Sequence, residues 1–256
     1  VYVAGYYPHN YDFLAFAASM IGRSAQSIGA AEKIASLASP EILRAPGMTF
    51  TQHHHTRHLQ MKVRFGRWRD ILNAPAPGAD LPHARAMWHY ARGRALAAEG
   101  NVQAAEVELK SVRAAAQNRE LAQLRLEFNT SGQVLGIASE VLAGHIAAAK
   151  GDLKSAVVHL RHAARQEDEL TYGEPPEWSV PVRQELGLVL LKAGRAADAE
   201  RMFREDLKRF PENVWSLQGV AQALHAQNRV KEAEQITKRL KQIWSTADIT
   251  PGAASL

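Results

Sequence analysis

Histidines stand at several places in this 256-residue chain, and the first of them lies close to an aspartate. The imidazoles and the carboxylate that could act together are His9, Asp12, His53, His54, His55, His58, His89 and His145. Imidazole and carboxylate groups are common protein ligands of divalent metals. No compact spacing such as His-x-x-Glu-His joins them, however. The alternative is that most of them form hydrogen bonds on helix surfaces or between helices.

A second group with possible chemistry lies at residues 171–183. It consists of Tyr172, Glu174, Pro175, Pro176, Glu177, Trp178 and Arg183. The two prolines fix an extended course, so the segment could cap one end of a groove or seal apolar surface between the fourth and fifth repeats. A catalytic role for Glu174 or Glu177 would need burial or a charged neighbour to raise the pKa. The sequence shows neither.

The net charge of +5 is concentrated between residues 51 and 94. Eight basic residues stand there against two acidic ones: Arg57, Lys62, Arg64, Arg67, Arg69, Arg85, Arg92 and Arg94 against Asp70 and Asp80. Such a region could attract an acidic partner or a phosphate backbone. The favoured interpretation is a solvated helix face, with arginine stems covering apolar surface. Nucleic-acid motifs with interleaved aromatic residues are missing, so we do not expect nucleic acid as a partner.

Composition excludes several other classes. An apolar fraction of 46% and a charged fraction of 22% are those of an ordinary soluble globular protein. The chain has no cysteine, so thiolate chemistry and disulfides are excluded. Phosphate loops, dinucleotide fingerprints and nucleophile elbows do not occur. Apolar stretches are too short for a membrane span, and we predict no catalytic residue.

One spacing recurs along the chain. Glycine, a second glycine seven residues later and alanine five residues after that form three triplets, which are Gly93, Gly100 and Ala105; Gly144, Gly151 and Ala156; and Gly187, Gly194 and Ala199. Close crossing of two antiparallel helices requires small side chains at the crossing points. The middle glycine takes the left-handed turn that ends the first helix. The pattern therefore predicts helix hairpins, with the first glycine of each triplet buried where the paired helices cross.

These repeats resemble the tetratricopeptide repeat. The breaks at Gly66 and Gly100, and those at Gly194 and Asn228, lie 34 residues apart, which is the period of that family. A first copy runs from residue 10 to residue 37, with its break at Gly22. The resemblance implies an all-α, right-handed superhelix of about six hairpins, forming one domain over residues 1–256. Residues 39–49 and 171–181 are expected to be ordered loops, and residues 113–130 an extra helical length.

The resemblance also implies a concave groove lined by the first helix of each pair. Counting back from each break places His9, Asp12, His53, Tyr90 and His145 at groove positions. The predicted ligand-binding residues are His9, Asn10, Asp12, His53, Tyr90, His145, Glu174, Trp178 and Arg183, and the predicted metal ligands are His9, Asp12, His53 and His145. If these residues converge, the site would hold a divalent metal ion; otherwise we expect no cofactor.

Two segments, at residues 7–20 and 174–183, resemble a subset of bacterial tetratricopeptide proteins that usually continue further upstream. We therefore expect this chain, which begins at Val1 in a helical pattern, to be the C-terminal part of a longer one. Its compartment, cytoplasm or periplasm, and its oligomeric state are not predicted. The first hypothesis is a scaffold that binds a protein or peptide in its groove. The second is a protein that binds a metal or small molecule, which could be an enzyme.

Overall fold

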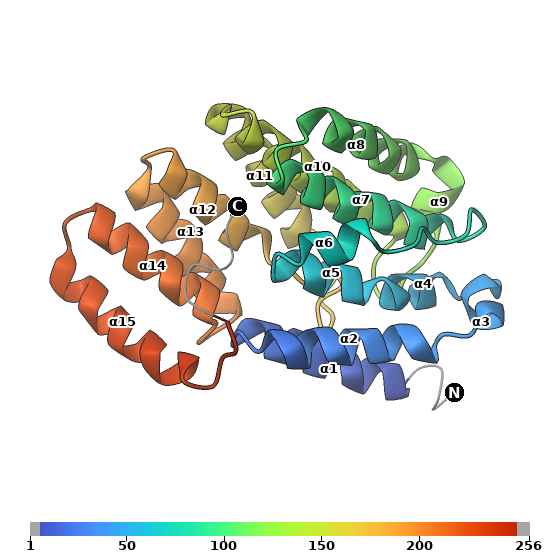
Figure 1. Ribbon diagram of the computed structural model, residues 1–256, viewed down its shortest axis with the longest axis horizontal. Helices are drawn as coiled ribbons and strands as arrows, with labels where there is room; N and C mark the ends of the chain where they lie inside the picture. The colour runs from blue at the N-terminus through green and yellow to red at the C-terminus, as the bar shows by residue number, and fades with distance from the viewer. Residues whose placement is uncertain (1–5, 250–256) are drawn as a thin grey trace.

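The structure, a computed structural model, describes residues 6–249, and within that range its regular elements are helices, without a β-strand (Figure 1). A single antiparallel bridge joins Arg125 and Thr130. The helices are α1 (Tyr7–Met20), α2 (Ser24–Leu37), α3 (Pro40–Arg44), α4 (Thr49–His55), α5 (Arg57–Arg64), α6 (Trp68–Leu72), α7 (Pro82–Ala98), α8 (Val102–Gln117), α9 (Arg119–Gln123), α10 (Ser131–Ala149), α11 (Leu153–Asp168), α12 (Val182–Lys192), α13 (Ala196–Arg209), α14 (Val214–Ala226) and α15 (Val230–Trp244). The predicted all-α fold is confirmed.

Most of these helices form a stack of antiparallel hairpins. The pairs are α1–α2, α5–α6, α7–α8, α10–α11, α12–α13 and α14–α15. Each pair is joined at a residue with φ between 61° and 81°, and these residues are Gly22, Gly66, Gly100, Gly151, Gly194 and Asn228. All six are breaks that the sequence predicted, because only glycine and, at some cost, asparagine adopt this conformation readily.

The small residues lie where the paired helices cross, as the triplets predicted. Gly93, Gly144 and Gly187 are all buried. A Cβ atom on Gly144 would lie 2.8 Å from Leu160 Cγ of the partner helix, and one on Gly187 would lie as close to the ring of Phe203. A larger side chain at either position would push the two helices apart.

Three segments are less regular than a simple hairpin stack. The first helix of the second hairpin is split into α4 and α5 at Thr56, and α6 has only five residues. Residues 39–49, expected as a loop, contain α3, because Ser39 caps its first turn by accepting a hydrogen bond from the Ile42 amide. Residues 113–130, expected as an extra helical length, are helical only in part: α8 ends at Gln117, α9 follows, and residues 124–130 are irregular.

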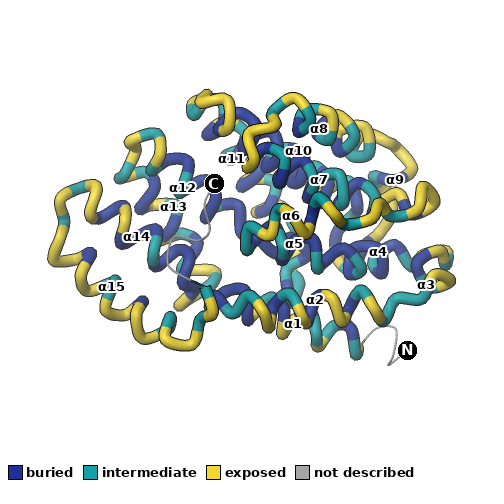
Figure 2. Tube along the Cα trace, viewed as in Figure 1, coloured by how far each residue is buried: buried dark blue, intermediate teal, exposed yellow. Residues whose placement is uncertain are grey.

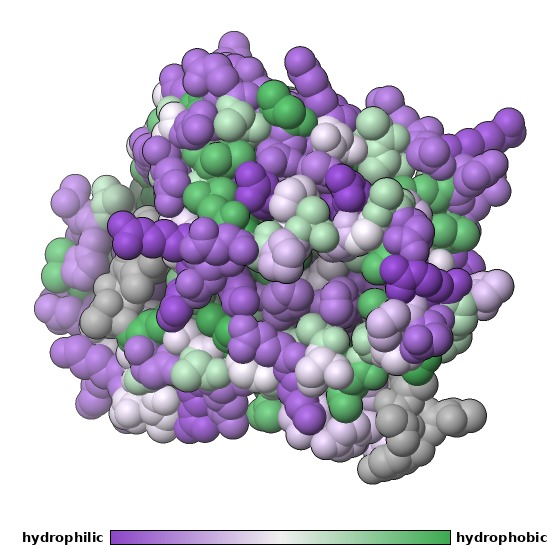
Figure 3. All heavy atoms as spheres, turned by 45° about the vertical axis from the view of Figure 1, so that its right-hand side comes forward, coloured by the Kyte–Doolittle hydropathy of each residue, from purple (hydrophilic) through white to green (hydrophobic). Residues whose placement is uncertain are grey.

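The helix α10 lies at the centre of the fold and packs against α7, α8, α9 and α11. Among the described residues it is the one helix long and apolar enough to cross a membrane, yet 72% of its apolar window is buried inside the protein. Figure 2 shows this contrast, with buried residues along the inner helices and exposed ones along α8 and α15. On the face seen in Figure 3, hydrophobic residues form small areas among hydrophilic ones.

The first and last hairpins meet, so the stack closes on itself (Figure 1). The indole N–H of Trp215, on α14, donates a hydrogen bond of 2.8 Å to the carbonyl of Ser19, on α1. The carboxylate of Asp248 accepts hydrogen bonds from the backbone amides of Ser24 and Ala25 at the start of α2, at 2.6 and 2.8 Å. An array of helix hairpins normally has two free ends, whereas here those ends are joined.

Candidate functional site

The connection between α11 and α12, residues 169–181, passes through the inner side of the stack. Residues 177–180 are buried there. The carbonyl of Glu177 accepts hydrogen bonds from His53 Nε2 at 2.9 Å and from Arg57 Nη1 at 3.2 Å, although these partners precede it by more than a hundred residues. The chain itself therefore occupies the part of the groove beside α4 and α5. We call this part the filled section.

The side chains of this segment fix its course. The carboxylate of Glu177 accepts hydrogen bonds of 2.9 Å from the backbone amides of Glu127 and Phe128. The indole of Trp178 packs edge-on against Tyr90, with ring centroids 5.4 Å apart. Glu174, in contrast, is exposed. The segment was expected to cap the groove or to seal two neighbouring hairpins, but its contacts reach α4, α5 and α7.

A chain of hydrogen bonds crosses the filled section. His53 Nε2 must donate to the Glu177 carbonyl, so its Nδ1 accepts from His83 Nε2 at 3.0 Å. His83 Nδ1 then accepts from the Ser131 hydroxyl at 2.7 Å. Burial lowers the pKa of His53 well below its ordinary value and lowers that of His83 to about 3. Both imidazoles are therefore neutral, and both nitrogens of each ring are already bonded.

Arg57 is the charged centre of the filled section. It is 1% exposed, and its guanidinium contacts the carboxylate of Asp12, with Nε 2.6 Å from Oδ1 and Nη2 2.7 Å from Oδ2. It also donates to the hydroxyl of Ser179. These contacts neutralise a buried cation and attach α1 to the inner segment.

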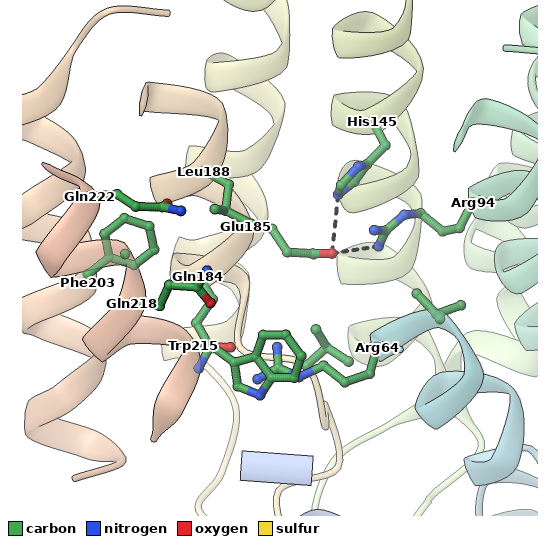
Figure 4. Close-up of a pocket in the computed structure, with 13 residues that line it drawn as sticks. Arg64, Arg94, His145, Gln184, Glu185, Leu188, Phe203, Trp215, Gln218 and Gln222 are labelled. Carbon is green, nitrogen blue, oxygen red and sulfur yellow. Dashed lines mark ion pairs between the residues drawn. The ribbon is translucent and has the colours of Figure 1, made fainter. Parts of the chain in front are cut away.

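The groove stays open beyond this point, where a cavity of about 150 Å³ lies between α5, α7, α10, α12 and α14 (Figure 4). We call it the open section. It is lined by Val63, Arg64, Arg94, His145, Val180, Gln184, Glu185, Leu188, Phe203, Trp215, Gln218, Gly219 and Gln222. Aromatic and aliphatic walls surround a few charged and amide groups, which is the usual make-up of a ligand pocket.

Three ionisable side chains meet on one side of the open section. Glu185 Oε1 lies 2.7 Å from Arg94 Nη1 and 3.2 Å from His145 Nε2 (Figure 4). Burial opposes ionisation of Glu185, but Arg94 and His145 outweigh it and lower the pKa of the carboxyl to about 2. Burial also lowers the pKa of His145, so its imidazole is neutral. The three side chains together therefore carry one positive charge, on Arg94, and one negative charge, on Glu185.

The structure divides the predicted groove residues between the two sections. Asp12, His53, Tyr90 and Trp178 belong to the filled section, whereas His145 lines the open one. His9 is half-buried beside Phe13, with ring centroids 4.9 Å apart, and Asn10 is exposed. Arg183 lies outside both sections, where it forms a two-pronged ion pair of 2.7 Å with Asp168. Glu174 is exposed and accepts from the Tyr172 hydroxyl.

The predicted metal ligands His9, Asp12, His53 and His145 are not brought together. Within residues 6–249, no three histidine, aspartate or glutamate side chains are grouped closely enough to hold a metal ion. Among the predicted residues, Asp12 lies near a histidine: its Oδ2 is 4.0 Å from His54 Nε2, which is also 3.5 Å from Glu127 Oε1. Metal binding stays a prediction, which metal analysis of the wild type and of His9→Ala would test.

Sequence reasoning missed the residues that charge the groove. Arg57, Arg64 and Arg94 belong to the basic range between positions 51 and 94 and were interpreted as part of a solvated face, yet all three are buried at 7% exposure or less. The spacing of two of these arginines could have indicated their position. Arg57 and Arg64 are seven residues apart, so they share one face of a helix with Gln60, and that face carries the groove positions of its hairpin.

The hairpin geometry agrees with a family comparison. Residues 190–243, which span the end of α12, α13, α14 and most of α15, match the family model of the tetratricopeptide repeat. These residues carry the tetratricopeptide repeat. A search of curated proteins and one of solved structures each found no significant match. The matched residues are the last hairpins of the stack, and the same break geometry extends the tetratricopeptide pattern back to Gly22.

Proposed function

We propose that the chain is a binding module whose open section receives part of a partner protein. Tetratricopeptide arrays are interaction scaffolds, and an array of this kind presents its first helices to a ligand. Here α5, α7, α10, α12 and α14 all contribute side chains to the open section. The open section is therefore the place where a partner would contact the largest number of repeats at once.

One observation carries this proposal: the chain's own segment covers the filled section of the inner surface and leaves the open section uncovered. In the filled section, Glu177 and Trp178 take the place that a bound peptide would have in the groove. The open section shares α5 and α7 with the filled section but has no segment across it, and Gln222 at its rim is exposed. A ligand that enters here meets the apolar walls Phe203 and Trp215.

A photocrosslinking experiment tests the location. A photoreactive amino acid is placed at Gln218 or Gln222 in the open section and, as a control, at Val107 or Val158, which are both 61% exposed on the second helices α8 and α11. We expect a discrete crosslinked partner from the two glutamine positions and none from the two valine positions. Equal crosslinking at all four would contradict a groove-directed scaffold.

A blocking substitution provides the second arm. Leu188 is half-buried at the cavity wall, so Leu188→Arg would fill the open section with a charged side chain without removing a core residue. We expect loss of the crosslinked partner with little change in melting temperature. Val158→Arg is the matched control and should keep the partner. Undiminished binding by Leu188→Arg would place the interaction elsewhere on the molecule.

A further inference from the structure

The first and last long helices, α1 and α15, differ in the chemistry of their outer surfaces. Helix α1 has no lysine or arginine, and its one carboxylate, Asp12, is 2% exposed and paired with Arg57. Helix α15 carries six exposed charged residues, which are Lys231, Glu232, Glu234, Lys238, Arg239 and Lys241. The terminal helices of a repeat array need a polar outer face for solubility. Helix α15 has such a face, whereas α1 does not.

The outer side of α1 carries a stripe of neutral side chains, which we define as Tyr6, His9, Asn10, Phe13 and Leu14. These positions follow one another at helical spacing, so they lie on one side of the helix. Tyr6, Phe13 and Leu14 are 59%, 38% and 39% exposed. Asn10 is also exposed, and His9 is half-buried between the apolar residues. We call this surface the α1 stripe.

The closure of the stack leaves the α1 stripe uncovered. It uses the C-terminal end of α1, where Phe16 meets Phe210 with ring centroids 5.6 Å apart and the Ser19 carbonyl accepts from Trp215. Helix α1 lies at the lower edge of the molecule in Figure 1. Contiguous exposed apolar surface of this kind marks sites of protein association.

The rings of the α1 stripe are already ordered. The ring of Tyr6 stacks on that of His9, with centroids 6.3 Å apart and an angle of 26° between the planes. His9 in turn packs edge-on against Phe13, with centroids 4.9 Å apart. Side chains that are ordered before binding lose less conformational entropy when a partner covers them.

The α1 stripe is chemically suited to a copy of itself. It contains no lysine, arginine, aspartate or glutamate, so two copies meet without repulsion between such charges. The amide of Asn10 has both donor and acceptor atoms and forms no hydrogen bond with another described residue. Two such amides can pair across a two-fold axis. In an antiparallel pair of α1 helices Asn10 is central, because Tyr6 and Leu14 are each four residues away.

No other surface of the described chain matches the α1 stripe in this way. The other large apolar side chains that are exposed have a charged residue within four positions along the chain. They are Val107 near Lys110, Leu124 and Phe128 near Arg125 and Glu127, Val158 near Lys154, Tyr172 near Glu174, and Val230 near Lys231. A contact between one of them and the α1 stripe would desolvate a charge without an opposite charge to pair with it.

We propose that two copies of this chain associate through the α1 stripe, as an antiparallel pair of α1 helices with Asn10 at the two-fold axis. The stripe has far fewer residues than the roughly 20–30 per partner of a standard interface. The association is therefore weak and depends on protein concentration. Such a dimer presents two open sections, but the inference does not depend on what these sections bind.

Sedimentation velocity of the 256-residue chain, between about 1 and 500 µM, tests the proposal. We expect the wild type to pass from monomer to dimer as its concentration rises. Asn10→Asp places two carboxylates at the axis and should weaken the dimer at least about tenfold. Asn10→Lys should weaken it for the same reason. An equimolar mixture of the two variants should form a heterodimer, because opposite charges then meet at the axis.

Two controls separate the α1 stripe from other parts of the surface. Gln103→Glu makes the same change from amide to carboxylate at an exposed position on α8 and should leave the dimer unchanged. The chain has no cysteine, so Asn10→Cys carries a single thiol. Mild oxidation should link Asn10→Cys into a covalent dimer and should leave Gln103→Cys monomeric. Since Asn10 is exposed, its variants should melt at the wild-type temperature.

Two results would overturn the proposal. A wild type that stays monomeric at the highest concentration shows that the α1 stripe does not bind a second copy and leaves it to a different protein. A wild-type dimer that Asn10→Asp does not weaken shows that the two copies meet elsewhere. Crosslinking of a partner through Gln222 is independent of both results, so the proposed function stands or fails separately.

Discussion

Arg57 and Arg64 stand seven residues apart on one helix, α5, and both are buried, but their surroundings are opposite. Arg57 contacts the carboxylate of Asp12 and donates to the inner segment. Arg64 lies over Trp215 with two donor atoms unpaired. Asp12 on α1 and the inner segment together surround the first arginine, whereas the groove beside the second one is open.

The comparison shows which buried charges are structural. A buried ion pair is costly to break, because removal of one partner leaves the other uncompensated. A buried charge without a partner costs folding energy in the absence of a ligand, and such costs are concentrated at functional sites. Substitutions in the filled section should therefore lower the free energy of unfolding. Substitutions in the open section should mainly weaken binding.

The largest effect is expected at Arg57. Arg57→Leu leaves the carboxylate of Asp12, which is 2% exposed, without its cation and should cost about 3–5 kcal/mol in the free energy of unfolding. Urea denaturation measures this. The double variant Arg57→Leu with Asp12→Leu should recover part of the loss, since it leaves no buried charge. A loss no larger than that of Arg64→Leu would remove the distinction between the two arginines.

The next largest effect on stability is expected at the helix crossings that support both sections of the groove. Gly144→Leu should overpack α10 against Leu160 of α11 and cost at least about 1–3 kcal/mol. Gly29, on α2, is the control, because a Cβ atom there meets nothing within 4 Å. Gly29→Ala should stabilise the protein by roughly 0.5–1 kcal/mol through helix propensity. Equal melting temperatures for the wild type and Gly144→Leu would show that the crossing is not close-packed.

The filled section should also be sensitive to acid. The pKa of His83 falls from its ordinary 6.5 to about 3 on burial, so its contribution to stability is present above pH 6.5 and is lost as the pH falls toward 3. The slope reaches up to about 1.4 kcal/mol per pH unit. Chemical denaturation between pH 7 and 4 should show a flatter slope for His83→Gln than for the wild type. His225→Gln, at an exposed position on α14, should keep the wild-type slope.

The smallest effects on stability are expected for two tryptophans, Trp178 and Trp215, which differ in their hydrogen bonding. The indole N–H of Trp178 is buried without a partner, whereas that of Trp215 donates to Ser19. Trp178→Phe keeps the edge contact with Tyr90 and removes an unsatisfied donor, so its effect on stability should stay below about 1 kcal/mol. Trp215→Phe should cost about 0.5–1.5 kcal/mol more. The reverse order in thermal melts would contradict these hydrogen-bond assignments.

The hairpins could be predicted from the sequence because their breaks depend on local chemistry. Gly22, Gly100 and Asn228 each take a conformation that few residues adopt, and glycine at the crossings is required by the distance between helices. The family period adds the order of the stack. Residues 39–49 were harder, because prolines indicate irregular backbone but also begin short helices such as α3.

The candidate site could be predicted only in part. Counting placed His53, Tyr90 and His145 on inner helices correctly, but it could not show that residues 177–180 divide the groove between them. Pro175 and Pro176 indicate that the segment is extended, but they do not indicate which helices it runs toward. The burial of Arg64 depends on Trp215, which lies far along the chain. Long-range contacts of this kind have no local signature in one sequence.

Closure of the stack changes how the molecule should come apart. In an open row of hairpins the terminal units have a neighbour on one side only, and they exchange their amide hydrogens first. Here Asp248 holds the start of α2, and Trp215 holds the end of α1. If one terminal hairpin unfolds, the terminal hairpin packed against it becomes exposed to solvent. Amide exchange in α2 and in α14 should therefore become slower or faster together. The molecule should thus open as one cooperative unit and not by fraying inward from its ends.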